Sequence, residues 1–187
     1  MAERCVRFCD SAEALAGALA AAVPRPTAVV GVGNPLAGDD GFGPAVAAAL
    51  VPPPPGLRVF DVRAVPESFL GPIAAAGCPG VLFVDAASLG AEPGRLALVP
   101  ADRLAEVDVS THVVSLALTA EAIRRLVLER TGGPAPRSAL LAVEPADLKA
   151  PDRLSPPVVR AVATAAEALR RFAAGPSGPE TKETDPA

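Results

Sequence analysis

The chain is 187 residues long, 50% of them hydrophobic, and it has a formal net charge of −4 with a pI of about 5.1. This length is enough for one domain whose core needs neither disulfides nor a structural metal. The acidic balance argues against nucleic acid as a partner, and no apolar run reaches the length that spans a membrane. Because the N-terminus has no signal-peptide pattern and the three cysteines match no zinc spacing, we expect a protein of the reducing cytoplasm.

The first predicted element is a helix at residues 11–23, with Ser11 as its N-cap and Pro24 at its end. Apolar runs and helical patterns then alternate along the chain, and the last helix is expected to be capped by Ser155 with proline at its first position. In chain order the patterns predict a strand at 27–33, a helix at 40–50, a strand at 57–62, a helix at 67–76, strands at 80–86 and 95–99, a helix at 114–130, a strand at 138–143 and a helix at 156–173.

This alternation predicts the architecture of the domain. Strands that alternate with helices are joined by right-handed crossovers and form a mostly parallel sheet. We therefore expect a single three-layer α/β domain over residues 1–174, with a twisted, mostly parallel five-stranded sheet and helices on both faces. Residues 1–26 are expected to form a helical extension on the edge or outer face of the sheet, and residues 175–187 a disordered polar tail. No heptad pattern or apolar stripe indicates an oligomer, so a monomer is expected.

A glycine-rich loop follows the first strand of the sheet and first suggests a nucleotide site. The dinucleotide fingerprint requires glycine at the sixth position from Gly31, where this chain has Leu36. Asp39 and Asp40 also place negative charge where a pyrophosphate would bind. A nucleotide-binding domain is therefore disfavoured. Taken alone, either acid is equally well explained as an N-cap or first-turn residue of the following helix.

Two further polar residues are predicted at the same edge of the sheet as Asp40. Asp85 ends an apolar strand, and His112, the only histidine, follows the short segment 107–109. Each has an ordinary structural explanation when taken alone. Together, two carboxylates and an imidazole beyond the carboxyl ends of the strands are suitable donors for a divalent transition metal. A site with three such ligands is open, and a metal carried by a substrate could complete its coordination there.

At these residues the sequence resembles the hydrogenase maturation proteases. Four elements of that family occur in order between residues 27 and 172, and a further stretch resembles members that serve hydrogenase 3 of the formate-hydrogenlyase type, with Ser68 where asparagine is usual. The four elements are Gly31-Val32-Gly33-Asn34 with Asp39-Asp40-Gly41-Phe42-Gly43, Val84-Asp85-Ala86 with Gly90-Ala91-Glu92-Pro93-Gly94, Ser110-Thr111-His112, and Glu144-Pro145 with Leu154-Ser155-Pro156-Pro157-Val158, and the further stretch is Val65-Pro66-Glu67-Ser68.

The resemblance implies a phosphorylase/hydrolase-like three-layer α/β fold and an aspartyl-type endopeptidase. Such an enzyme removes a short C-terminal peptide from the immature large subunit of a nickel-iron hydrogenase after nickel insertion. The resemblance assigns both the catalytic and the metal-binding role to Asp40, Asp85 and His112. The metal is then nickel carried by the substrate, and no tightly bound metal of the protein's own is expected. Asp39 is a candidate structural residue, the general base stays open, and the alternative function is a non-proteolytic nickel-sensing maturation chaperone.

Overall fold

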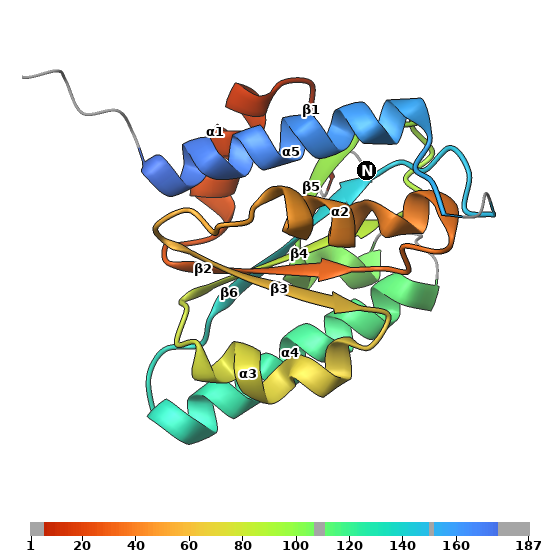
Figure 1. The fold of residues 1–187 in the computed structure, drawn as a ribbon. Helices are drawn as coiled ribbons and strands as arrows, with labels where there is room; N and C mark the ends of the chain where they lie inside the picture. Colours follow the sequence, from red (N-terminus) through yellow and green to blue (C-terminus); the bar gives the residue numbers. More distant parts are fainter. Residues whose placement is uncertain (1–5, 107–110, 150–151, 176–187) are drawn as a thin grey trace, which may run out of the picture.

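The computed structural model describes residues 6–106, 111–149 and 152–175, without the side chains of residues 101, 105–106 and 111–115. Figure 1 shows a twisted sheet with helices on both of its faces. None of the helices in these ranges is long and apolar enough to cross a membrane. The polar tail predicted at residues 175–187 lies outside the described residues, apart from Gly175.

The sheet has six strands in the order β1-β5-β6-β4-β2-β3. The four strands β3, β2, β4 and β6 pair in parallel, whereas β5 pairs antiparallel to β6 and β1 antiparallel to β5. The mostly parallel α/β prediction is therefore confirmed. The strands are β1 (Arg7–Cys9), β2 (Thr27–Val32), β3 (Leu57–Arg63), β4 (Gly80–Ala86), β5 (Leu96–Pro100) and β6 (Arg137–Val143).

The prediction of five strands was wrong by one, because β1 was missed. This strand has only three residues, too few to show an alternating pattern in the sequence. It forms because the chain just before Ser11 lies along the otherwise free edge of β5. The other five strands lie where the apolar runs predicted them.

Helices form two layers, one on each face of the sheet. In one layer α1 packs on α5, which also contacts α2, and in the other α3 packs on α4, as Figure 1 shows. The α-helices are α1 (Ala12–Ala22), α2 (Phe42–Ala49), α3 (Leu70–Ala75), α4 (Thr111–Thr131) and α5 (Pro156–Ala174), and the 3₁₀ helices are η2 (Gly38–Gly41), η3 (Pro66–Phe69) and η4 (Ala101–Glu106).

The central strands are apolar throughout because both of their faces are covered. In β4, Leu82 and Val84 belong to the core beneath α1, α2 and α5, while Val81 and Phe83 belong to the core on the α3 and α4 side. Every residue of β2 and β4 is buried. Continuous apolar runs, rather than alternating ones, are expected of strands enclosed in this way.

The two predicted helix caps have different outcomes. The Ser11 hydroxyl oxygen accepts a hydrogen bond from the backbone N–H of Ala14 at 3.1 Å, which confirms the cap of α1. Ser155 does occupy the N-cap position of α5, but its side chain makes no capping bond. Its hydroxyl donates instead to the Asp39 carboxylate at 2.8 Å, so the predicted cap position and the proline that follows it are confirmed, but the side chain serves Asp39 rather than the helix.

Candidate active site

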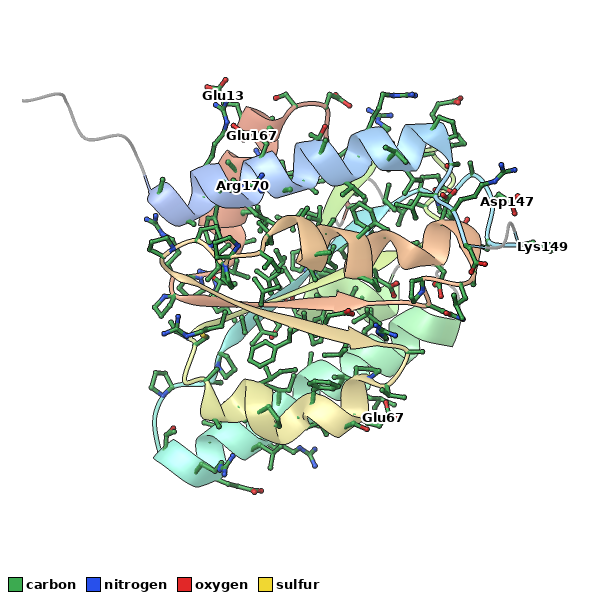
Figure 2. All side chains as sticks on the ribbon, in the orientation of Figure 1. Glu13, Glu67, Asp147, Lys149, Glu167 and Arg170 are labelled. Atoms are coloured by element: carbon green, nitrogen blue, oxygen red, sulfur yellow. The ribbon has the colours of Figure 1, made fainter. Side chains whose placement is uncertain are left out.

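The parallel strands all end at one edge of the sheet, and the loops that follow them carry the candidate residues. Asp85 belongs to the end of β4, Asp40 lies in η2 after β2, and Asp147 follows β6. In Figure 2 the side chains of Asp147 and Lys149 lie at this carboxyl edge, toward which the β2 and β3 arrows point. Ligands of open α/β sheets bind at such an edge.

Asp85 is a buried acid without a full set of partners. Only 1% of its surface is exposed, and its Oδ1 accepts one hydrogen bond, from the backbone N–H of Ala86 at 2.8 Å. Its Oδ2 has no hydrogen-bond partner among the described residues. Burial, with a smaller contribution from the charge of Asp40, raises the pKa of Asp85 to about 8. An unpaired buried carboxylate is costly, so Asp85 is suited to bind either a proton or a cation.

Asp40 reaches the same place from the loop after β2. It is half-buried, and its Oδ2 accepts a hydrogen bond from the backbone N–H of Asn34 at 2.7 Å. Gly33, with φ +124°, lets the η2 backbone approach this closely. A Cβ at Gly33 would lie 1.9 Å from the Asp40 carbonyl oxygen and 3.5 Å from Asp85 Oδ1. The absence of a side chain at Gly33 is therefore what allows η2 to lie against the end of the sheet beside Asp85.

Asp39 holds two loops together. Its carboxylate is fully buried and accepts from the backbone N–H groups of Ala146, Asp147 and Ser155 at 2.8, 2.9 and 2.7 Å, in addition to the Ser155 hydroxyl. Burial acts to raise the pKa of Asp39, but these hydrogen bonds outweigh it and lower the pKa. The geometry thus favours the structural role for Asp39 and leaves Asp40 as the acid whose charge acts on Asp85.

His112 is the second residue of α4, whose ribbon begins at the carboxyl edge in Figure 1. The helix begins three residues before the predicted residue 114, so the backbone of His112 belongs to its first turn. The His112 side chain lies outside the described part of the structure. That it lies beside Asp40 and Asp85 therefore stays a prediction. Among the described residues, no three His, Cys, Asp or Glu side chains gather closely enough to hold a metal ion.

Glu144 is a second anchoring acid, whose role the sequence did not reveal. It is 7% exposed, and its carboxylate accepts hydrogen bonds from the backbone N–H groups of Leu89 and Ala91 at 2.6 and 3.1 Å and from the Ser88 hydroxyl at 3.4 Å. These bonds fix the loop that follows Asp85. The sequence does place Glu144 and Pro145 directly after an apolar strand. A buried acid at such a position needs hydrogen-bond partners, and this could have indicated its anchoring role.

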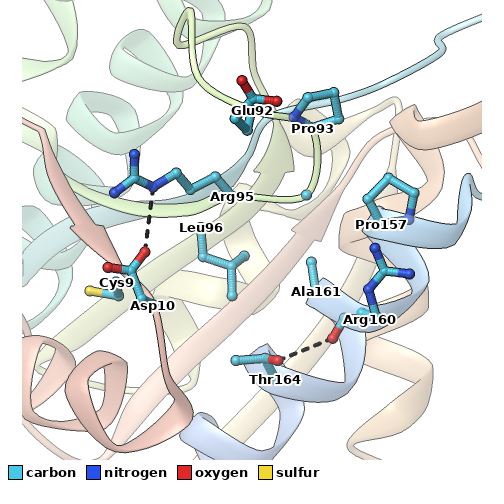
Figure 3. Close-up of a pocket in the computed structure, with 11 residues that line it drawn as sticks. Cys9, Asp10, Glu92, Pro93, Arg95, Leu96, Pro157, Arg160, Ala161 and Thr164 are labelled. Carbon is cyan, nitrogen blue, oxygen red and sulfur yellow. Dashed lines mark hydrogen bonds and ion pairs between the residues drawn. The ribbon is translucent and has the colours of Figure 1, made fainter.

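A separate hollow of about 420 Å³ lies beside β1, between the loop that precedes β5 and the first half of α5 (Figure 3). Its rim carries an ion pair between Arg95 and Asp10 at 3.4 Å, and Arg95 also lies over the ring of Phe8. Neither Asp40 nor Asp85 lines this hollow. It is therefore distinct from the pair of carboxylates at the ends of the parallel strands.

Comparison with known proteins decides the family. A family model described as hydrogenase maturation protease matches residues 47–171. The chain belongs to the hydrogenase maturation protease family. The matched range contains Asp85 and His112, whereas Asp40 lies just before it. The resemblance inferred from the sequence motifs is thus confirmed.

Individual relatives agree with this assignment. The chain is 35% identical over 81 residues to the hydrogenase 3 maturation protease of Escherichia coli K12, covering 43% of this chain and 52% of that protein. The chain therefore spans about half the length of this curated relative. The crystal structure of the NiFe hydrogenase maturation protease HycI from Thermococcus kodakarensis KOD1 is 27% identical, covers 86% of this chain and 98% of its own, and superposes with a TM-score of 0.70.

The fold is also shared with a more distant relative. The solution structure of the endopeptidase HycI from Escherichia coli is 23% identical, covers 77% of this chain and 88% of its own, and has a TM-score of 0.65. At this level of identity the likeness concerns the fold alone.

Proposed function

We propose that this protein is an endopeptidase that removes a short C-terminal peptide from the immature large subunit of a nickel-iron hydrogenase after nickel has been inserted. In this proposal it acts in the cytoplasm. Membership of the hydrogenase maturation protease family supports the reaction class. The 35% identity to a hydrogenase 3 maturation protease supports a large subunit of the hydrogenase 3 type as the partner.

The observation that carries the proposal is the unpartnered Oδ2 of Asp85 beside Asp40. A divalent cation brought to this edge by another protein would supply the missing partner. Binding would displace the proton that Asp85 otherwise holds at neutral pH, because a carboxylate must be deprotonated to bind a metal. We propose that His112 completes the donor set, so that nickel seated in the large subunit is recognised by two carboxylates and one imidazole.

Hydrolysis then requires an activated water and a polarised peptide carbonyl. A metal ion can polarise the carbonyl, and a nearby carboxylate can accept the proton of the attacking water. The two acids differ in environment, since Asp85 is buried and Asp40 is half-buried.

The test is to incubate the purified protein with an immature large subunit of a nickel-iron hydrogenase from the same organism, in nickel-loaded and nickel-free forms. Mass spectrometry follows the C-terminus of the large subunit. Loss of a short peptide from the loaded form alone is the expected result. An intact C-terminus in both forms, together with nickel-dependent association, would contradict cleavage and favour the non-proteolytic chaperone.

A further inference from the structure

Three loops of the carboxyl edge each carry an exposed large apolar side chain. Leu36 is 68% exposed between β2 and η2, Val65 is 46% exposed between β3 and η3, and Leu148 is 50% exposed between β6 and α5. We call these three residues the apolar collar. A single exposed leucine is ordinary, but three large apolar side chains on loops at one edge of the sheet indicate a contact surface.

The loops that carry the collar are hydrogen-bonded to one another. Asp39 links the loop of Leu36 to that of Leu148, because its carboxylate accepts from the backbone N–H groups of Ala146 and Asp147 and its own N–H donates to the Asp147 carbonyl at 2.9 Å. The loop after β2 also meets the end of β3, where the N–H of Gly33 donates to the Arg63 carbonyl at 3.0 Å. The collar is therefore built on backbone segments that are held in place together.

Charged side chains lie next to the collar in the sequence. Asp147 and Lys149 flank Leu148, and Glu67 follows Val65 by two residues. Figure 2 shows Asp147, Lys149 and Glu67 on the outside of the molecule at the carboxyl edge. Apolar groups with charged groups of both signs around them are the usual anatomy of a protein–protein contact.

The collar lies on loops at the same edge of the sheet as the two carboxylates. The loop after β2 carries both Leu36 and Asp40, and Asp85 is buried at the end of the next strand in the sheet. A polypeptide that brings a bond to these acids must lie against the loops of this edge. We propose that the apolar collar binds an extended apolar segment of the immature large subunit next to the bond that is cut, an inference that rests on the proposed function.

The experiment compares collar variants with a control from the opposite edge of the sheet. The control residue is Val51, which follows α2 and is 72% exposed. Helix α2 runs away from η2, and its last residue, Ala49, accepts a hydrogen bond from Arg170 near the end of α5. The probe is the nickel-loaded immature large subunit used above. Leu36→Ser and Leu148→Ser should each raise KM about fivefold or more with kcat changed less than about twofold. Val51→Ser should keep KM within about twofold of the wild type.

The collar and the proposed function fail in different ways. One outcome is that the wild type cleaves the subunit but the two collar variants have the same KM as Val51→Ser. The proposed role of the collar would then be wrong, while the proposed endopeptidase activity would stand. If the wild type associates with the subunit but does not cleave it, the endopeptidase is wrong, and weaker association of the two collar variants than of Val51→Ser would still support the collar. A wild type that neither binds nor cleaves overturns both. Circular dichroism of each variant verifies that these exposed substitutions leave the fold intact.

Discussion

Asp85 should make the protein less stable as the pH rises, and Asp85→Asn should remove this dependence. The folded chain holds a proton on Asp85 up to a pH of about 8, whereas an unfolded chain releases it near 3.9. Between these values the folded state binds more protons than the unfolded state. The free energy of unfolding therefore loses about 1.4 kcal/mol per pH unit in this window.

The magnitude is large enough to measure. From pH 5 to pH 7 the contribution of Asp85 changes by about 3 kcal/mol, a substantial fraction of the stability of a small domain. Asparagine cannot ionise, so the free energy of unfolding of the wild type should rise relative to that of Asp85→Asn as the pH falls. The amide of the substituted side chain adds an unpaired donor, which lowers the free energy of unfolding of Asp85→Asn equally at every pH. The test is therefore how the difference in free energy of unfolding between the two proteins changes with pH.

Urea unfolding at pH 5, 6, 7 and 8 gives the free energy of each protein by linear extrapolation. The exposed substitution Asp102→Asn serves as the control and should run parallel to the wild type. The series is repeated in a His112→Ala background, because imidazole titrates in the same range. Parallel profiles for the wild type and Asp85→Asn across the whole range would refute the conclusion that Asp85 is protonated because it is buried.

Three further outcomes are expected. Asp39→Asn should lower the free energy of unfolding by about 2–4 kcal/mol at pH 7, because an amide NH₂ would face backbone donors. Urea denaturation measures this difference, and an unchanged free energy of unfolding would contradict the anchoring role. A Cβ at Gly43 would lie 2.2 and 2.3 Å from two backbone oxygens, whereas one at Gly17 would meet nothing within 4 Å. Gly43→Ala should therefore destabilise by more than about 2 kcal/mol and Gly17→Ala stabilise by about 0.5–1 kcal/mol, and equal melting temperatures would refute this contrast. His112→Ala should abolish processing while the circular dichroism spectrum stays that of the wild type, and cleavage at the wild-type rate would refute the three-residue site.

The fold was predictable because long apolar runs have few alternatives. A strand covered on both faces, such as β4, is apolar from end to end, and the sequence between 80 and 86 shows this directly. Strand β1 was not predictable, because its three residues form a strand only where the edge of β5 is available. Local patterns therefore located the elements, and long-range pairing decided the edge of the sheet.

The positions of Asp40 and Asp85 in the fold were predictable from the sequence, but their environments were not. The motifs predicted Asp40 and Asp85 at one edge, and a Cβ placed at Gly33 would lie 1.9 Å from the Asp40 carbonyl oxygen and 3.5 Å from Asp85 Oδ1, so both residues adjoin Gly33. No local pattern shows that Asp39 accepts hydrogen bonds from residues beyond β6, or that Ser155 serves Asp39 rather than its own helix. Such contacts join segments that are distant in the sequence, so they depend on the finished fold.

The strand order has a consequence for how this chemistry could arise. From β2 the chain turns toward β3 at one side of the sheet, and from β4 it turns the other way, toward β5. Neighbouring parallel strands whose connections leave in opposite directions form a topological switch point, which leaves a crevice between their ends. Asp40 follows β2 and Asp85 lies at the end of β4, the two strands that flank this switch point. The position of the site thus follows from the winding of the backbone, and its chemistry follows from the side chains at the ends of these two strands.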